Sequence, residues 1–329
     1  MSQTEQLLQR IRQKGSESQE SASHEKHRGL RLEDVIALYE SVGHRDSDYL
    51  EWLHRVYTSM NLPCIPSEYK KTLGEDKTKL AIFDIMADDL ADNFVTRSRF
   101  LLQDFIRIPW HNTVQKHDYI KVGQAIWDDY FESVTRYPRF KELEGIFYFD
   151  LRQVFSSMEY SSLINTVGLD NPFEMSHHSP YGCAVILALD MDLMCLPNFD
   201  LEELRTMRSI SYLAQKIAHI ANMLSTYPRE VLEKDMSSPI ISLAIRKRII
   251  TKEDLGGRDV IEKLRPLEWI FRSRATSDVQ KVALYEKEIH SVNIRGFSQM
   301  LEDLVKRWGT SPELDSSQSL AGKISRQAS

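Results

Sequence analysis

One segment of this 329-residue chain carries carboxylates through a run that is otherwise almost entirely apolar. Asp84, Asp88 and Asp92 recur at every fourth position, and most of the residues around them from 81 to 95 are large and apolar or alanine. At about 100° per residue, positions four and eight apart share one face of an α-helix. Because a helix that is apolar nearly all round is expected to be buried, this face must carry three carboxylates into the interior.

Carboxylates that are buried close together are costly unless they are protonated, paired or bound to a cation. A divalent cation would resolve the conflict on this helix. Oxygen ligands from carboxylate, amide and hydroxyl groups favour Mg²⁺, with Mn²⁺ as the alternative, over zinc. The competing interpretation is that an acidic run marks a solvated helix face, and the apolar flanks argue against it.

A second triplet of oxygen-bearing side chains has the same spacing. Asn222, Thr226 and Glu230 would share one helix face, but Pro228 lies between the last two and removes a backbone donor. Either the helix continues with a kink, or it ends near Ser225 and a new helix begins with the proline in its first turn. If the helix continues, the chain has two rows of oxygen-bearing side chains, which we expect to face each other. We call Asp84, Asp88 and Asp92 the first ladder, and Asn222, Thr226 and Glu230 the second ladder.

Composition limits the classes of function that fit this chain. With 42% hydrophobic and 27% charged residues it is typical of a soluble globular protein, and a net charge of −6 gives no electrostatic reason to bind nucleic acid. Three cysteines without metal-ligand spacing suit a reducing compartment, so we expect a cytoplasmic protein. We expect no stable membrane insertion, because the longest apolar run, 181–196, contains two aspartates. Assembly into a homodimer is left open.

The apolar spacing is nearer to 3.6 than to 2 along most of the chain, which predicts an all-α fold. We expect one antiparallel helical bundle over residues 30–310, preceded by a disordered N-terminal arm (1–29) and followed by a disordered C-terminal tail (311–329). The expected helices span 30–57, 70–108, 119–135, 140–167, 181–196, 201–224, 239–250, 264–271 and 278–308.

Taken together, the two ladders resemble the metal-binding motifs of the class I terpene synthases. Asp88-Asp89-Leu-Ala-Asp92 is similar to the DDxxD motif of that family, and Asn222-x₃-Thr226-x₃-Glu230 to its N-x₃-(S/T)-x₃-E motif. The resemblance implies the helical bundle of the class I terpenoid synthases. It also implies that Asp88, with Asp89 or Asp92, and the Asn222 triplet bind three Mg²⁺ ions around a substrate diphosphate.

Other positions extend the resemblance to the diphosphate. Arg229 precedes the motif glutamate where the family often has a basic residue, and Arg307-Trp308 resembles a terminal Arg-Tyr pair. The family's diphosphate-sensing arginine has no counterpart between residues 152 and 205, where His178 is the candidate substitute and Gly182 the candidate helix break. A surface role for the arginines and a structural role for His178 are the alternatives.

The resemblance implies that the chain ionises a prenyl diphosphate with Mg²⁺ and cyclises the carbocation, with Asp88, Asn222, Glu230, Arg229 and Arg307 as the main catalytic residues. Geranylgeranyl or copalyl-type diphosphate is the favoured substrate, as in bacterial diterpene synthases, and farnesyl diphosphate is the alternative. Two other functions remain open: a prenyl chain-elongating or coupling transferase, and a non-catalytic helical interaction protein. Four aromatic residues are candidates for stabilising the carbocation: Phe83, Phe105, Trp110 and Phe155.

Overall fold

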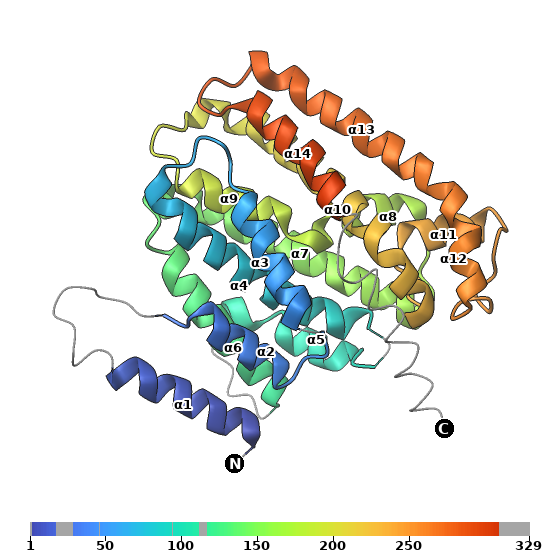
Figure 1. Ribbon diagram of the computed structural model, residues 1–329, viewed down its shortest axis with the longest axis horizontal. Helices are drawn as coiled ribbons and strands as arrows, with labels where there is room; N and C mark the ends of the chain where they lie inside the picture. The colour runs from blue at the N-terminus through green and yellow to red at the C-terminus, as the bar shows by residue number, and fades with distance from the viewer. Residues whose placement is uncertain (1, 18–28, 46, 94, 112–116, 309–329) are drawn as a thin grey trace.

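The computed structural model describes residues 2–17, 29–45, 47–93, 95–111 and 117–308, apart from the side chains of 12–17, 307 and 308. Within these residues the secondary structure is helical and contains no β-strand, which confirms the predicted all-α class. Figure 1 shows the long helices running alongside one another in a bundle. No helix in the described part has both the length and the apolar composition needed to cross a bilayer.

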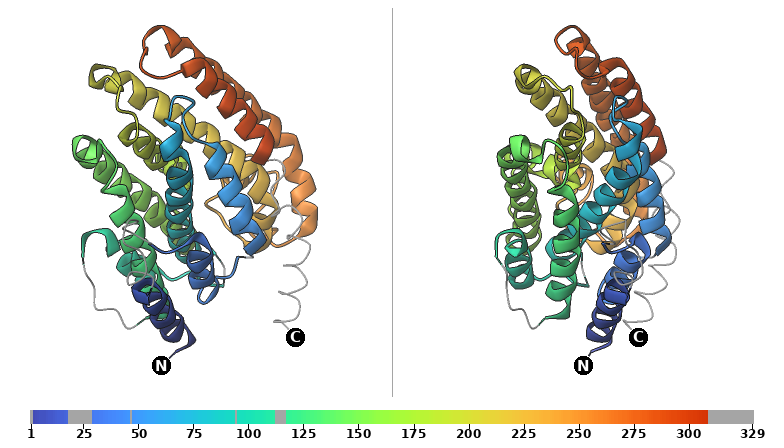
Figure 2. Two further views of the ribbon diagram at one scale, coloured as in Figure 1. Left: turned by 60° about the vertical axis from the view of Figure 1, so that its left-hand side comes forward. Right: turned by 90° about the vertical axis from the view of Figure 1, so that its left-hand side faces the viewer.

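Three long helices form the centre of the bundle: α4 (Ser67–Ala91), α7 (Phe140–Val167) and α10 (Leu204–Glu233). Helix α4 packs against α3 (Ser47–Ser59), α6 (Asp118–Val134) and α7, while α10 packs against α9 (Val185–Met194), α13 (Glu268–Leu284) and α14 (Ile294–Trp308) (Figures 1 and 2). The shorter helices are α1 (Gln3–Glu17), α2 (Leu32–Glu40), α5 (Arg99–Phe105), α8 (Pro172–His178), α11 (Pro239–Arg246) and α12 (Arg258–Leu264). Five 3₁₀ turns complete the described helices: η1 (Ile108–Trp110), η2 (Ser179–Cys183), η3 (Leu201–Glu203), η4 (Arg265–Leu267) and η5 (Tyr285–Lys287).

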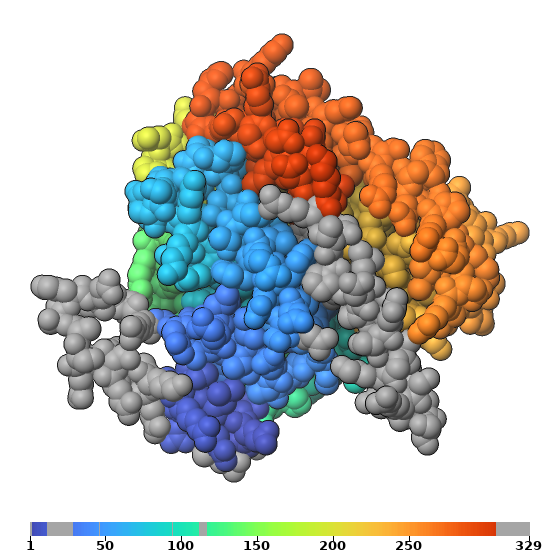
Figure 3. Space-filling view, viewed as in Figure 1, coloured from blue at the N-terminus to red at the C-terminus, as the bar shows by residue number. Residues whose placement is uncertain are grey.

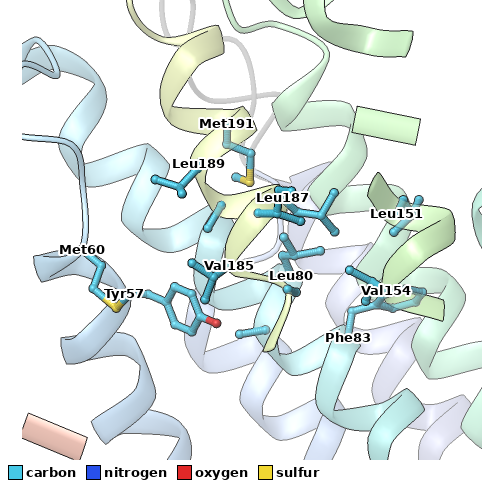
Figure 4. Packing of buried hydrophobic residues seen from close by; sticks show 14 of the residues in the cluster. Tyr57, Met60, Leu80, Phe83, Leu151, Val154, Val185, Leu187, Leu189 and Met191 are labelled. Atoms are coloured by element: carbon cyan, nitrogen blue, oxygen red, sulfur yellow. The ribbon is translucent and has the colours of Figure 1, made fainter. Parts of the chain in front are cut away.

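The core lies where α3, α4, α7 and α9 converge. Figure 4 shows Leu80 and Phe83 of α4 among Val154 of α7 and Val185 and Leu187 of α9. Each such side chain, fully buried, contributes about 1.5–3 kcal/mol to folding. Helices α3 and α4 approach closely at Gly74, where a Cβ atom would lie 3.0 Å from the Thr58 Cα.

Three of the expected helices are interrupted in the structure. Residues 30–57 form α2 and α3, residues 70–108 form α4 and α5, and residues 278–308 span the end of α13 and α14. Local polar contacts make the turns: the Gly43 amide donates to the Tyr39 carbonyl at 2.6 Å, and the Ser98 hydroxyl caps α5 by accepting from the Leu101 amide at 3.3 Å. Apolar periodicity cannot detect such breaks, because the pattern resumes on the far side.

The predicted disordered N-terminal arm is wrong for residues 3–17, which form helix α1. Leu7, Leu8 and Ile11 pack on the main core, and Lys121 of α6 forms an ion pair with Glu5 at 2.7 Å. Figure 3 shows α1 (dark blue) at the edge of the bundle, next to α2. Residues 18–28 and the predicted tail, 311–329, lie outside the described residues.

Candidate active site

The first ladder occupies the C-terminal end of α4. Asp84 and Asp88 lie one turn apart on the helix, and Asp92 follows its last residue, with a backbone amide that donates to the Asp88 carbonyl at 3.0 Å. All three side chains line one cavity of about 110 Å³. The spacing therefore places these carboxylates on a common surface, although the helix ends before the third.

The second ladder lies on α10, which continues through Pro228 to Glu233. A helix end near Ser225 is therefore contradicted. The Thr226 hydroxyl donates to the Asn222 carbonyl at 2.9 Å and makes a short contact with the Glu230 carboxylate. Asn222, Thr226 and Glu230 line the same cavity as the α4 carboxylates, so the two ladders border one space.

The charges around the cavity are unbalanced. Its lining contains five carboxylates and two arginines: Asp84, Asp88, Asp92, Glu230, Asp235, Arg45 and Arg229. Arg45, from the loop between α2 and α3, contacts Asp88 at 2.8 Å, and Arg229 contacts Glu233 at 2.5 Å. Acidic side chains therefore exceed basic ones around this space, which favours the binding of a cation.

The protein environment shifts the acidity of these groups. Burial raises the pKa of Asp84 and Asp92 well above the usual range, and the nearby Asp88 carboxylate adds to both shifts. Burial also raises the pKa of Asp88, which the Arg45 guanidinium opposes. Burial and Asp235 raise the pKa of Glu230 to about 8, against the opposing effect of Arg229. This environment stabilises the ionised form of the carboxyl groups poorly. A bound metal ion would stabilise that form and lower their pKa values.

The donor set fits a hard divalent cation. Asp84 Oδ1 and Glu230 Oε2 are buried and have no hydrogen-bond partner within the described residues. The available ligands are carboxylate, amide and hydroxyl oxygens, as Mg²⁺ and Mn²⁺ prefer. Among the described side chains, no three His, Cys, Asp or Glu residues are already gathered as a metal site. Mg²⁺ usually takes one or two carboxylates and completes its shell with water and substrate phosphates.

Asp89 differs from its neighbour Asp88. It is 1% exposed and does not line the cavity. Its Oδ1 accepts a hydrogen bond from Arg45 Nε at 3.0 Å, and its Oδ2 accepts one from the Tyr39 hydroxyl at 2.9 Å. One residue further along the helix turns the side chain by about 100°, which explains the different direction. We therefore leave Asp89 out of the ligand set and regard it as the group that positions Arg45.

His178 does not reach the candidate site. It ends α8, lies 5.1 Å from the Tyr160 ring between ring centroids, and lines a separate cavity of about 230 Å³. Turn η2 and Ala184, in the left-handed region at φ 48°, form the break before α9, so the helix expected from residue 181 begins at Val185. Gly182 lies in this break and lines the candidate cavity.

Arg307 and Trp308 are the last residues of α14, and their side chains lie outside the described part of the structure. Their predicted contact with diphosphate stays a prediction.

The four aromatic candidates pack against one another instead of lining the cavity. Phe83 lies 4.7 Å from Phe105 and 6.2 Å from Phe155, and Trp110 lies 5.7 Å from Phe155, all between ring centroids. Helix α3 supplies the aromatic rings of the cavity, Tyr49 and Tyr57. The Tyr57 hydroxyl donates to the Cys183 carbonyl of η2 at 3.4 Å, which directs the ring inward (Figure 4).

The cavity lining also includes Arg45, His219 and Asp235, which the sequence did not point to. Burial lowers the pKa of His219 to about 4, so this imidazole is neutral near pH 7. Asp235 is fixed by Asn165 Nδ2 at 2.7 Å and by the Ser237 amide at 2.8 Å. Position 219 is three residues before Asn222, which could have indicated the shared helix face, whereas nothing in the sequence indicates Arg45.

Comparison of the sequence with models of known protein families finds no match, and comparison with curated proteins finds none either.

Proposed function

We propose that this protein is a Mg²⁺-dependent class I terpene synthase that ionises a prenyl diphosphate and cyclises the resulting carbocation. One observation carries the proposal: Asp88 of α4, Asp92 directly after it, and Asn222, Thr226 and Glu230 of α10 line the same cavity. Asp84 also lines it, one turn along α4 from Asp88. Two sets of hard oxygen donors on opposite helices suit a substrate whose polyanionic head lies between them.

The proposed reaction begins with cleavage of the allylic C–O bond. The electron pair leaves with the diphosphate oxygen, and a carbocation remains on the hydrocarbon chain. Mg²⁺, held by Asp88 and Asp92 on one side and by Asn222, Thr226 and Glu230 on the other, would supply positive charge that neutralises the leaving group. Arg229 lines the same cavity and would donate hydrogen bonds to the departing diphosphate.

Apolar groups form one part of the cavity wall, and five serines and His219 form another. Leu53, Ala81, Ile85, Met158 and Met223 line it, together with the rings of Tyr49 and Tyr57. The apolar part would shield the carbocation from capture by water, and tyrosine faces would stabilise passing positive charge. The cavity volume of about 110 Å³ is below the 300–1,000 Å³ typical of small-molecule sites. Binding of a C15 or C20 chain therefore requires side chains or helices around the cavity to move apart.

The test is product analysis with the full chain. The protein is incubated with Mg²⁺ and, separately, geranyl, farnesyl, geranylgeranyl or copalyl diphosphate, and extracts are examined by gas chromatography with mass spectrometry. We expect a cyclic hydrocarbon or alcohol and stoichiometric diphosphate from one of them, with geranylgeranyl or copalyl diphosphate favoured. A longer prenyl diphosphate formed only with added isopentenyl diphosphate would instead indicate a chain-elongating transferase.

Variants connect that activity to the cavity. Asp88→Ala and Asn222→Ala should each abolish diphosphate release while far-UV circular dichroism stays unchanged. Asp128→Ala, which removes an exposed aspartate from α6, is the matched control and should keep full activity. If no diphosphate is released from any of the four substrates, the proposal fails.

A further inference from the structure

Arg45 places a positive charge inside the acidic cavity from a part of the chain remote from both ladders. It lies in the loop between α2 and α3, and its side chain is only 10% exposed. Nη2 lies 2.8 Å from Asp88 Oδ2 and 2.9 Å from Asp89 Oδ1, and Nε donates to Asp89 Oδ1 at 3.0 Å. A single guanidinium thus spans two consecutive aspartates, one of which lines the cavity.

The contacts of Arg45 with the two aspartates differ in burial. Asp89 is buried and also accepts a hydrogen bond from Tyr39, whose hydroxyl oxygen in turn accepts the Arg45 backbone amide at 3.3 Å. Asp88 is 30% exposed and faces the cavity. The contact with Asp89 therefore belongs to the packed loop, whereas the contact with Asp88 can be exchanged without unpacking it.

A cation bound to Asp88 would meet this guanidinium directly. Asp88 Oδ2 already accepts a charge-assisted hydrogen bond, and a divalent ion on the same carboxylate would lie within a few ångströms of the arginine charge. At such distances in a protein, repulsion between like charges is strong. An anionic ligand in the cavity would remove the conflict, because it can accept hydrogen bonds from the guanidinium and ligate the metal at once.

We propose that Arg45 competes with a metal ion for the Asp88 carboxylate. When metal and diphosphate bind together, the arginine releases Asp88 and keeps its contact with Asp89. This inference rests on the proposed function. It makes metal binding weak in the absence of diphosphate and strongly cooperative with it, so that the cavity does not fill with metal before the substrate arrives. Arg45 is then a positioning residue for the first metal ion.

The test is a titration of the full chain with Mn²⁺, followed by electron paramagnetic resonance of the free ion, with and without inorganic diphosphate. The decisive variant is Arg45→Met/Asp89→Asn, which removes one positive and one negative charge and leaves Asp88 unpaired with Arg45. We expect its Mn²⁺ affinity without diphosphate to exceed that of the wild type by about tenfold or more. The further gain in affinity on adding diphosphate should be smaller than in the wild type.

The matched control is Arg139→Met/Glu142→Gln, because this pair, at 2.7 Å, is also an arginine with a carboxylate and does not line the cavity. Its Mn²⁺ affinity should equal that of the wild type. Arg45→Lys is a second variant for the case that the double variant does not fold. It keeps the charge but loses the planar contact with both aspartates, so we expect its Mn²⁺ affinity without diphosphate to exceed that of the wild type.

The outcomes separate this inference from the proposed function. One outcome is that the wild type binds Mn²⁺ with diphosphate while the Arg45 variants bind it no more tightly than the wild type does. This result overturns the competition by Arg45 and leaves the metal site in place. Wild-type protein that binds no Mn²⁺ with or without diphosphate overturns both.

Discussion

Glu230→Gln should make the metal-free protein more stable and remove its response to metal. Glu230 is 9% exposed, and one of its carboxylate oxygens has no partner in the described part of the chain. Burial, reinforced by Asp235, raises its pKa from 4.5 to about 8. Glutamine keeps the size of the side chain and an oxygen for the Thr226 hydroxyl, but it carries no charge.

The magnitude follows from proton linkage. Between pH 4.5 and about 8 the folded wild type binds more protons at Glu230 than the unfolded chain does, so its unfolding free energy falls as pH rises through this range. Each pKa unit corresponds to about 1.4 kcal/mol, which gives about 2 to 4 kcal/mol at pH 7.5. The glutamine variant escapes this loss. Its advantage should be absent at pH 4 and largest near pH 8.

The assay is urea unfolding followed by circular dichroism at several pH values, first with EDTA and then with Mg²⁺ and diphosphate. Ligands that bind only the folded state should stabilise the wild type and not the variant. A glutamine variant that is no more stable than the wild type at pH 7.5 in EDTA would refute the reasoning, as would a gain that does not depend on pH.

Three further substitutions separate residues that hold the fold from those that act on the ligand. Lys77→Met should lower the unfolding free energy, measured in urea, by about 3–5 kcal/mol, because it leaves the buried Asp192 carboxylate without its ion-pair partner, 2.6 Å away. Lys77→Met/Asp192→Leu should recover most of the loss. Equal stability of the two variants would contradict this. Asp89→Asn should lower the unfolding free energy by about 1–3 kcal/mol through its contacts with Arg45 and Tyr39. Its diphosphate release should fall far less than that of Asp88→Ala, and the reverse order would count against our ligand set. Thr226→Val removes the hydroxyl and with it a partner of the buried Glu230 carboxylate. It should slow diphosphate release about tenfold or more and lower the unfolding free energy by about 1–3 kcal/mol; an unaffected rate would exclude this hydroxyl from the site.

The sequence is informative about the site where one helix carries all the information. Asp84 and Asp88 share a face because of helical spacing, Asp92 lines the same cavity from the residue after α4, and α10 keeps Asn222, Thr226 and Glu230 aligned. The helix continues through Pro228, although a proline at this position leaves the Leu224 carbonyl without its usual backbone donor.

The sequence is silent where a contact joins distant segments. Arg45 reaches Asp88 from 43 residues upstream, and no local pattern distinguishes it from a surface arginine. His178 lies in the segment where the resemblance suggested a diphosphate donor, yet α8 directs it to another cavity. Helix α1 was not predicted because its composition is mostly polar, although Leu7, Leu8 and Ile11 pack against the core.

In the proposed function, both ladders hold metal ions around one diphosphate. Anomalous diffraction from crystals grown with Mn²⁺ and inorganic diphosphate tests it directly, because manganese scattering locates the ions independently of any assay. We predict manganese peaks in the cavity ligated by Asp88 on one side and by Asn222, Thr226 and Glu230 on the other, with diphosphate oxygens between them. A diphosphate-bound crystal without manganese at either ladder, or with manganese only on surface carboxylates, would contradict the account.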